Sequence, residues 1–175
     1  YPGRDKIFLC YLATLMVPWH AIMIPQFLII KTLGLNDSHW SLILINIFSA
    51  FGVFLLRQFM MGIPEELSEA ARIDGANKMQ TFVRVVLPLV APGVVATAIY
   101  TFINTWNEFL YALILMNNTS KMTVAVALRS LDGAEILDWG DMMAASALVV
   151  LPSVIFFCLI QNKIAGGMSD GAVKS

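Results

Sequence analysis

The chain has 175 residues, of which 58% are hydrophobic and only 13% are charged, and its formal net charge is −1. Soluble domains carry about a quarter charged residues, so this composition indicates a membrane protein, and the small net charge gives no sign of nucleic-acid binding. Cys10 and Cys158 lie far apart in apolar segments and form no C-x-x-C pair. Neither a disulfide nor a cysteine metal site is therefore expected.

Four stretches of the chain contain no Asp, Glu, Lys or Arg: residues 7–30, 38–56, 85–107 and 142–162. Each is long enough to cross the hydrocarbon core of a bilayer, which takes roughly 18 to 20 residues in a helix. The alternative, a soluble helical bundle, requires a polar stripe along each helix, and residues 146–160 show none. We therefore predict an all-α membrane protein with four transmembrane helices, in which residues 1–175 form one membrane domain.

The first two stretches each contain residues that modify a plain span. Pro18 and Pro25 interrupt residues 7–30, and because proline lacks a backbone N–H, a kink or an early helix end is expected. Asn46 lies within residues 38–56. Polar groups at membrane depth are costly and usually face the interior of a helix bundle or a water-filled path, so Asn46 is a candidate for a substrate pathway.

A charged segment, residues 63–88, lies between the second and third stretches. Pro64 is suited to the start of a helix, and Glu65, Glu66 and Glu69 place negative charge near the positive end of the helix dipole. Gly75 is a natural C-terminal cap. Four residues at positions i, i+3, i+4 and i+7 share one narrow face of this helix: Leu67, Ala70, Ala71 and Asp74.

A second helix is expected after Gly75, with an apolar stripe formed by Met79, Phe82, Val83 and Val86, and Pro88 marks the entry into the next span. The segment is therefore predicted to be a helix–Gly–helix elbow. Its small-residue face suits a groove on a soluble partner protein. The other interpretation is an amphipathic helix on the membrane surface without a partner, and the residues alone leave both open.

Polar residues recur near the outer end of the third stretch. Asn104, Asn107 and Glu108 are spaced i, i+3 and i+4, so on a continuous helix they share a face, while Tyr100 and Trp106 point elsewhere. Amides, a carboxylate and aromatic rings are the groups that a sugar site needs. The alternative is that the Asn side chains bond between helices and that Trp106 and Glu108 anchor at the interface.

The segment of residues 117–141 is long enough to form a small ordered cap on the outer side. His20 and His39 stand alone, without Cys, Glu or His at ligand spacing, so no metal and no other cofactor is expected. No G-x-x-x-x-G-K-[ST] sequence occurs, so a nucleotide that drives this protein would bind another chain.

Lys and Arg are distributed unequally over the segments that connect the four stretches. One side holds eight of them: Arg4, Lys6, Arg57, Arg72, Lys78, Arg84, Lys163 and Lys174. The other side holds three: Lys31, Lys121 and Arg129. By the positive-inside rule, the first group is cytoplasmic, which places the charged segment and the C-terminus in the cytoplasm.

Several motifs together resemble a known family. Glu69-Ala70-Ala71, Gly75 and Val85-x-Leu87-Pro88 resemble the EAA loop of ABC-importer permeases. Residues 54–59, 71–75 and 106–109 resemble carbohydrate-importer permeases of the maltose type, and the tail, residues 171–175, resembles the end of the G-type subunit. The resemblance implies that the chain is the C-terminal part of a six-span subunit whose N-terminal spans are missing.

The resemblance also implies a function: a permease subunit, without enzymatic activity of its own, of an ATP-driven importer in a bacterial or archaeal cell membrane. Its implied partners are a dimer of ATP-binding subunits, a second permease and an extracytoplasmic binding protein that delivers a sugar. Contact with the ATP-binding subunit is implied for Glu69, Ala70, Ala71, Asp74, Gly75, Leu87, Pro88 and Lys174. The alternatives are a permease for a polyol or another non-sugar solute, and a non-transporting membrane scaffold.

Overall fold

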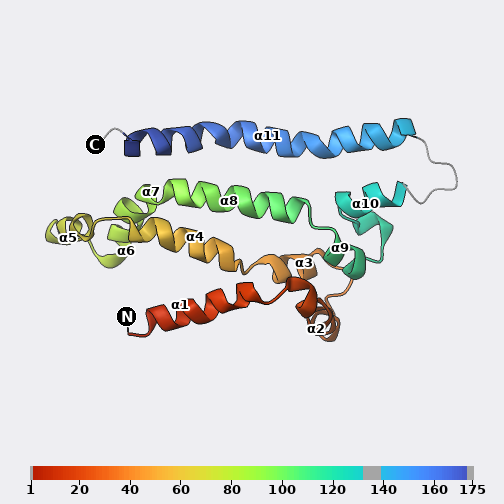
Figure 1. Ribbon diagram of the computed structural model, residues 1–175, viewed down its shortest axis with the longest axis horizontal. Coiled ribbons are helices and arrows are strands. Elements are labelled where there is room, and N and C mark those ends of the chain that lie inside the picture. The colour runs from red at the N-terminus through yellow and green to blue at the C-terminus, as the bar shows by residue number, and fades with distance from the viewer. Residues whose placement is uncertain (1, 132–138, 173–175) are drawn as a thin grey trace. The chain divides into compact units, whose positions relative to one another are not determined.

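The computed structural model describes residues 2–131 and 139–172, with side chains described as far as Gln161, and every regular element in these ranges is a helix (Figure 1). The predicted all-α class is therefore confirmed. The chain divides into two compact units, one drawn from residues 1–50 and 102–156 and the other from residues 51–101 and 157–175.

The first unit contains α1 (Arg4–Ala13), η1 (Thr14–Met16), α2 (Trp19–Thr32), α3 (His39–Asn46), α9 (Leu110–Leu115), η3 (Thr119–Lys121), α10 (Val124–Leu131) and the first part of α11 (Trp139–Ala172). The second unit contains α4 (Ala50–Met61), α5 (Glu65–Ile73), α6 (Lys78–Thr81), η2 (Phe82–Val86), α7 (Leu87–Leu89) and most of α8 (Ala91–Trp106). The expected outer cap thus contains η3 and α10, and residues 132–138 lie outside the described residues.

One helix is long and apolar enough to cross a membrane unbroken, the α11 segment Trp139–Gln161. Three pairs of helices pass the same test of length and composition when each pair is taken as one span: Arg4–Met16 with Trp19–Thr32, His39–Asn46 with Ala50–Met61, and Lys78–Leu89 with Ala91–Trp106. The sequence ranges agree with these segments. Among the described residues, the last span alone is a continuous helix, and the other three are broken; a break was expected in the first of these.

The break in the first pair has a local cause at Pro18. Val17 adopts an extended conformation, as residues before proline prefer, and α2 begins directly after Pro18 at a bend of 99°. The expected break is therefore confirmed at this proline. Pro25 lies inside α2 without ending it. A single missing N–H is tolerated there, because helices in apolar surroundings re-satisfy the freed carbonyl by small local adjustments.

The core of the first unit is small and surrounds the short helix α9. Tyr111, Leu115 and Met116 are buried together with Ile30 of α2. Partly buried side chains of α2, α3, the loop between them and α9 itself complete this cluster: Met23, Phe27, Leu35, Leu42, Ile45 and Ile114. α9 is thereby held against α2 and α3, which places its N-terminal residues beside both helices.

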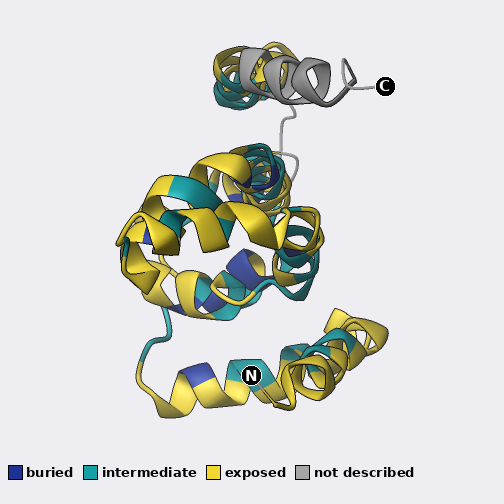
Figure 2. Ribbon diagram, turned by 90° about the vertical axis from the view of Figure 1, so that its left-hand side faces the viewer, coloured by how far each residue is buried: buried dark blue, intermediate teal, exposed yellow. Residues whose placement is uncertain are grey.

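Most large apolar side chains elsewhere in the described chain are exposed, as the predominance of exposed residues in Figure 2 shows. In α11, for example, Leu148, Val150 and Leu159 are all exposed. Soluble monomers rarely expose so much contiguous apolar surface. This pattern fits helices whose outer faces meet lipid or other membrane-embedded chains.

Candidate functional site

The charged segment folds as an elbow whose first helix ends in a defined cap (Figure 1). α5 begins directly after Pro64 and ends at Ile73. Gly75 follows with a φ of +85°, a left-handed conformation that side chains strongly disfavour. Its N–H donates to the carbonyl of Arg72 at 3.0 Å, and the N–H of Ala76 donates to that of Ala71 at 2.9 Å. These two bonds form a Schellman motif, so the predicted glycine cap is present.

The second helix of the elbow starts at once, with its own cap. Asn77 Oδ1 accepts from the backbone N–H of Gln80, and Gln80 Oε1 accepts from the backbone N–H of Asn77, both at 2.9 Å. This reciprocal pair is a capping box. Thr81 is buried, and its hydroxyl donates to the carbonyl of Asn77 at 3.1 Å. Because each helix end is capped, the two helices are joined without a flexible linker.

The helix after Asn77 departs from the predicted regular α-helix. Residues Phe82–Val86 form a π-helical turn, in which the N–H of Leu87 donates to the carbonyl of Phe82, five residues earlier. Proline at position 88 cannot donate to the carbonyl of Arg84, and its ring would crowd that carbonyl in α-helical register. The wider turn relieves the crowding. The expected stripe of Met79, Phe82, Val83 and Val86 therefore does not follow one continuous α-helical face.

The residues proposed for contact with an ATP-binding subunit lie on the surface of this elbow. Glu69, Ala70, Asp74 and Gly75 are exposed, and Ala71 is half-buried. Leu87 and Pro88 are also exposed, whereas Lys174 lies outside the described residues. Two apolar residues beside the motif, Ile73 and Met79, are 86% and 70% exposed. Ile73 was not singled out from the sequence, although it lies two residues before the predicted cap Gly75.

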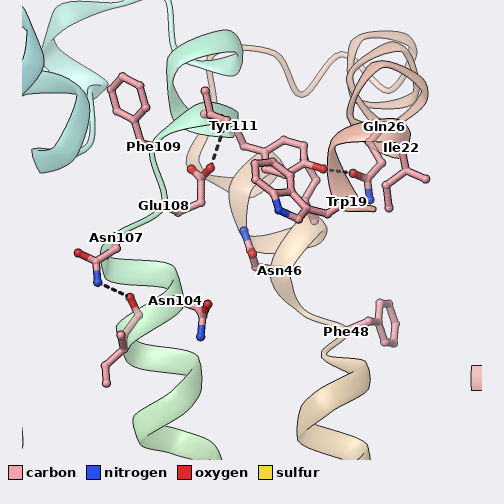
Figure 3. A pocket seen from close by; sticks show the side chains of 13 residues that line it. Trp19, Ile22, Gln26, Asn46, Phe48, Asn104, Asn107, Glu108, Phe109 and Tyr111 are labelled. Atoms are coloured by element: carbon pink, nitrogen blue, oxygen red, sulfur yellow. Dashed lines mark hydrogen bonds between the residues drawn. The ribbon is translucent and has the colours of Figure 1, made fainter. Parts of the chain in front are cut away.

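The four polar residues proposed for a substrate pathway line one cavity of about 620 Å³ in the first unit. The side chains drawn in Figure 3 come from α2, the end of α3, the end of α8, the start of α9 and the short segments that follow α3 and α8. The lining residues are Trp19, Ile22, Gln26, Ile45, Asn46, Phe48, Ile103, Asn104, Asn107, Glu108, Phe109, Leu110 and Tyr111. Such a mixture of aromatic, aliphatic and few polar groups is typical of small-molecule sites.

Two of the polar residues lie outside the helix on which they were predicted. α8 ends at Trp106, so Asn107 and Glu108 lie beyond the helix rather than on one helical face with Asn104. Asn46 is the last residue of α3 and lies at the break of the second span. The amide Nδ2 atoms of Asn46 and Asn107 donate to the carbonyls of Leu42 and Ile103 at 2.9 and 2.8 Å. Each of these two bonds runs to the carbonyl of the residue four positions earlier in the chain.

The carboxylate of Glu108 holds the start of α9. Its Oε1 accepts from the backbone N–H of Tyr111 at 2.7 Å, and its Oε2 accepts from the backbone N–H of Ala112 at 2.9 Å. The first N–H groups of a helix have no partner within the helix, so Glu108 satisfies two of them. Its side chain is half-buried and faces the cavity near Tyr111 (Figure 3).

The lining residues that the sequence reasoning missed include Trp19, Gln26 and Tyr111. The hydroxyl of Tyr111 donates to Gln26 Oε1, and the ring centroids of Tyr111 and Trp19 lie 5.7 Å apart. Tyr111 follows Glu108 by three residues, a helical spacing that was available as a signal. Trp19 and Gln26 lie about 80 to 90 residues away in sequence, and no local pattern indicates their proximity.

Trp106, which was expected to point away from the polar residues of its helix, is not among the residues that line this cavity. Its indole Nε1 donates to the carbonyl of Val149 in α11 at 3.3 Å. Its ring stacks on Phe102, whose ring also stacks on Phe156. Trp106 therefore joins α8 to α11 within the first unit, and the aromatic wall of the cavity is formed by Trp19 and Tyr111 instead.

Among the described residues, none that lines the cavity is Lys, Arg or His, and Glu108 is the one acidic residue of that lining. Within the described part of the chain, no group of three or more His, Cys, Asp or Glu side chains is placed to hold a metal ion. The arrangement offers amide, hydroxyl and carboxylate groups beside aromatic rings.

Comparison with known proteins places these features in a family. A family model described as a binding-protein-dependent transport system inner membrane component matches residues 3–169. The chain is 39% identical over 160 residues to an ABC transporter permease, ORF1, of Streptomyces antibioticus, and covers 70% of it. It is 33% identical to the arabinooligosaccharides transport permease AraQ of Halalkalibacterium halodurans, with 99% of this chain and 62% of the relative covered.

Two further similarities concern charged solutes. The sn-glycerol-3-phosphate transport permease UgpE of Yersinia pestis is 37% identical, with 97% of this chain and 61% of the relative covered. A chain in the crystal structure of a bacterial ABC transporter involved in import of the acidic polysaccharide alginate matches with a TM-score of 0.71 at 24% identity. That match covers 99% of this chain and 63% of the other.

The chain spans 61% to 70% of the length of these proteins, and less than two thirds in all but the first. The similarity in sequence nevertheless extends over 90% or more of this chain in each case. On the match of residues 3–169, the chain belongs to the family of inner membrane components of binding-protein-dependent transport systems.

Proposed function

We propose that this chain is a permease subunit of an ATP-driven importer that translocates a sugar delivered by an extracytoplasmic binding protein. The observation that carries this proposal is the family match over residues 3–169. The three broken helix pairs and the α11 segment are then four spans of a larger membrane domain. The charge distribution supports a cytoplasmic elbow, because eight of eleven Lys and Arg residues lie on that side.

The elbow supports the proposed coupling to ATP hydrolysis. It exposes Glu69, Ala70, Asp74 and Gly75 on two capped helices. Because both helix ends at the junction of the elbow are capped, α5 and α6 are expected to move together. Closure of an ATP-binding dimer around α5 would then displace α7 and α8 as well. In this proposal Leu87 and Pro88 connect the elbow to the span that follows.

The groups that line the cavity favour a neutral, hydroxyl-rich solute. Hydroxyl groups are recognised by amides and carboxylates that donate and accept hydrogen bonds, and sugar rings pack on aromatic faces. The lining provides Asn46, Asn104, Asn107 and Gln26 together with Trp19. Named relatives transport arabinooligosaccharides and diacetylchitobiose. The described residues of the lining include no Lys, Arg or His, which disfavours an anionic solute such as the sn-glycerol 3-phosphate for which the relative UgpE is named.

Purification of the intact assembly tests the proposal. The tagged full-length protein is extracted from its native membrane in mild detergent, and the co-purifying chains are identified by mass spectrometry. The assembly is then reconstituted into liposomes with its binding protein, and uptake of labelled arabinotriose, diacetylchitobiose and sn-glycerol 3-phosphate is measured with and without ATP.

We expect an ATP-binding subunit and a second permease to co-purify, and ATP to be required for uptake of one of the two sugars. Uptake of sn-glycerol 3-phosphate alone would assign the chain to an anionic solute. A chain recovered without an ATP-binding subunit, even after crosslinking, would indicate a scaffold and overturn the proposal.

A further inference from the structure

We propose that Glu108 is a positioning residue, which fixes the Tyr111 wall of the cavity by capping α9 rather than by binding the solute itself. This inference rests on the proposed function for its effect on uptake. The claim that Glu108 stabilises the start of α9 can be tested without any solute. The argument starts from the short helix α9, Leu110–Leu115.

α9 has only six residues, and helices this short are not stable in isolation because few of their backbone groups bond within the helix. Glu108 supplies acceptors for the N–H groups of Tyr111 and Ala112 at 2.7 and 2.9 Å. Both oxygens of one carboxylate are thus engaged by the helix start, where negative charge is also favoured by the helix dipole.

The other end of α9 is held independently. Leu115 is fully buried, and its carbonyl accepts from the backbone N–H of Asp37 at 2.9 Å. Because the C-terminal end is fixed by the core, loss of Glu108 would release the N-terminal turn, which carries Tyr111, without releasing the whole helix.

Tyr111 transmits this constraint to the cavity. Its hydroxyl donates to Gln26 Oε1 on α2, and its ring lies 5.7 Å from that of Trp19. These three side chains line the cavity together (Figure 3). A tyrosine whose backbone N–H is held by Glu108 and whose hydroxyl is held by Gln26 has a defined position, so it presents one fixed surface to a bound solute.

The consequence for specificity is that Glu108 and Tyr111 act on the solute as one unit. If Glu108 bound the solute directly, its removal and the removal of the Tyr111 hydroxyl would act independently and their effects would multiply. If Glu108 acts through Tyr111, the double variant is no worse than the more severe single variant. A double-mutant cycle separates these cases.

The first measurement is hydrogen–deuterium exchange on the intact purified assembly. In Glu108→Ala, we expect the amides of Tyr111 and Ala112 to exchange about tenfold faster or more, because charge-assisted hydrogen bonds are lost. Glu108→Gln, which retains one carbonyl acceptor, should give an intermediate rate and guards against misfolding of the alanine variant. Tyr111→Phe should leave these amides protected. Unchanged exchange in both Glu108 variants would overturn the proposed cap.

The second measurement is uptake by the reconstituted assembly, with the sugar that the wild type transports. We expect the KM for that sugar to rise by about tenfold in Glu108→Ala and by less in Glu108→Gln. The maximal rate per molecule of correctly inserted protein should change little. The double variant Glu108→Ala/Tyr111→Phe should match Glu108→Ala alone.

Multiplying effects in the double variant would show that Glu108 binds the solute directly, and would overturn the positioning role. A wild-type assembly that transports none of the probes would contradict the proposed function instead. The exchange measurement would still decide whether Glu108 holds α9, so the two failures remain distinguishable.

Discussion

The ammonium of Lys121 lies 3.1 Å from Oδ2 of Asp37 and 2.8 Å from the backbone oxygen of the same residue. Asp37 Oδ1 also accepts from the backbone N–H groups of Asn117 and Asn118, both at 3.0 Å. One residue in the loop between α2 and α3 thereby holds the segment between α9 and α10. Asp37 adopts a φ of 57°, a conformation that Asp and Asn tolerate better than most residues.

Replacement of Asp37 tests this connection. Asp37→Asn keeps an acceptor for the two N–H groups and suits the left-handed backbone, but it loses the ion pair with Lys121. Asp37→Ala loses every side-chain contact and is strained at this φ. We therefore expect the melting temperature in detergent to fall slightly in Asp37→Asn and clearly more in Asp37→Ala. Equal melting temperatures for the three proteins would contradict a stabilising role.

The same contacts predict a pH dependence. The backbone N–H of Asn118, together with the Lys121 ammonium and the N–H of Asn117, lowers the pKa of Asp37 below its ordinary value of 3.8, although partial desolvation opposes this. Because the pKa of Asp37 is lower in the folded protein than in the unfolded chain, its carboxylate stabilises the fold at pH values above the unfolded pKa. This stabilisation is lost as the pH falls through the lowered pKa of the folded protein. The difference in melting temperature between wild type and Asp37→Asn should be constant near neutrality and shrink below about pH 4.

Gly75 provides a test of the elbow. No atom lies within 4 Å of a Cβ built at this position, so a substitution there meets backbone strain and no clash. A left-handed conformation costs other residues roughly 1–2 kcal/mol. Gly75→Val should distort the turn, insert normally into the membrane, and lower the sugar transported per ATP hydrolysed. Gly75→Asn, which tolerates this φ, is the matched control. If Gly75→Val transported as much sugar per ATP hydrolysed as wild type, the proposed role of the elbow in coupling would be contradicted.

The sequence analysis located the spans and the elbow because these depend on local signals. The absence of charge defined the four apolar ranges, Pro18 indicated the first break, and Gly75 indicated the end of α5. The break after Asn46 carries no comparable signal, because the apolar run continues through it without a proline or glycine. The break at Val90 does carry one, since it lies between Pro88, which was expected to mark the entry into the span, and Pro92. Hydropathy therefore predicts a span but not its continuity.

For the candidate site, the sequence predicted the polar residues but not their surroundings. Asn46, Asn104, Asn107 and Glu108 were recognised because polar groups are rare in apolar stretches. Tyr111 resembles any interfacial aromatic residue until its hydrogen bond to Gln26 is seen. Contacts between residues so distant in sequence depend on how the helices pack, and one sequence does not encode that packing in a readable pattern.

The contact between Gly93 and Phe59 predicts intolerance to a methyl group. A Cβ at Gly93 would lie 2.5 Å from Cγ of Phe59 and 2.9 Å from its Cβ. Since the Phe59 Cβ is fixed to the backbone of α4, rotation of the ring does not relieve the clash. Gly93→Ala should therefore cost about 1–3 kcal/mol through overpacking. Gly62→Ala is the matched control, because its Cβ would meet no atom closer than 3.5 Å.

Thermal unfolding in detergent measures this difference. Gly93→Ala should melt at a lower temperature than wild type, and Gly62→Ala should not. Gly93→Ala should cost less in a Phe59→Ala background than in wild type, because the two closest atoms of Phe59, Cγ and Cδ2, are then absent. A Gly93→Ala protein as stable as wild type would show that α4 and α8 approach each other less closely than described.

Pro88 accounts for the π-helical turn Phe82–Val86, and its replacement should remove that turn. Pro88→Ala restores the N–H that can donate to the carbonyl of Arg84 and removes the ring that crowds it. Residues 82–86 should then return to α-helical register, which rotates the preceding residues by about 100° relative to those that follow. Leu87→Ala, which keeps the proline, is the matched control.

Spin labels placed singly at residues 79 to 87 report the helical register through their accessibility to oxygen. In wild type and Leu87→Ala, the accessibility should depart from a 3.6-residue period across 82–86, and in Pro88→Ala it should follow that period throughout. An unchanged profile in Pro88→Ala would mean that the packing of Thr81, which is buried, imposes the wider turn rather than the proline. In that case Thr81→Ala combined with Pro88→Ala should restore the α-helical period.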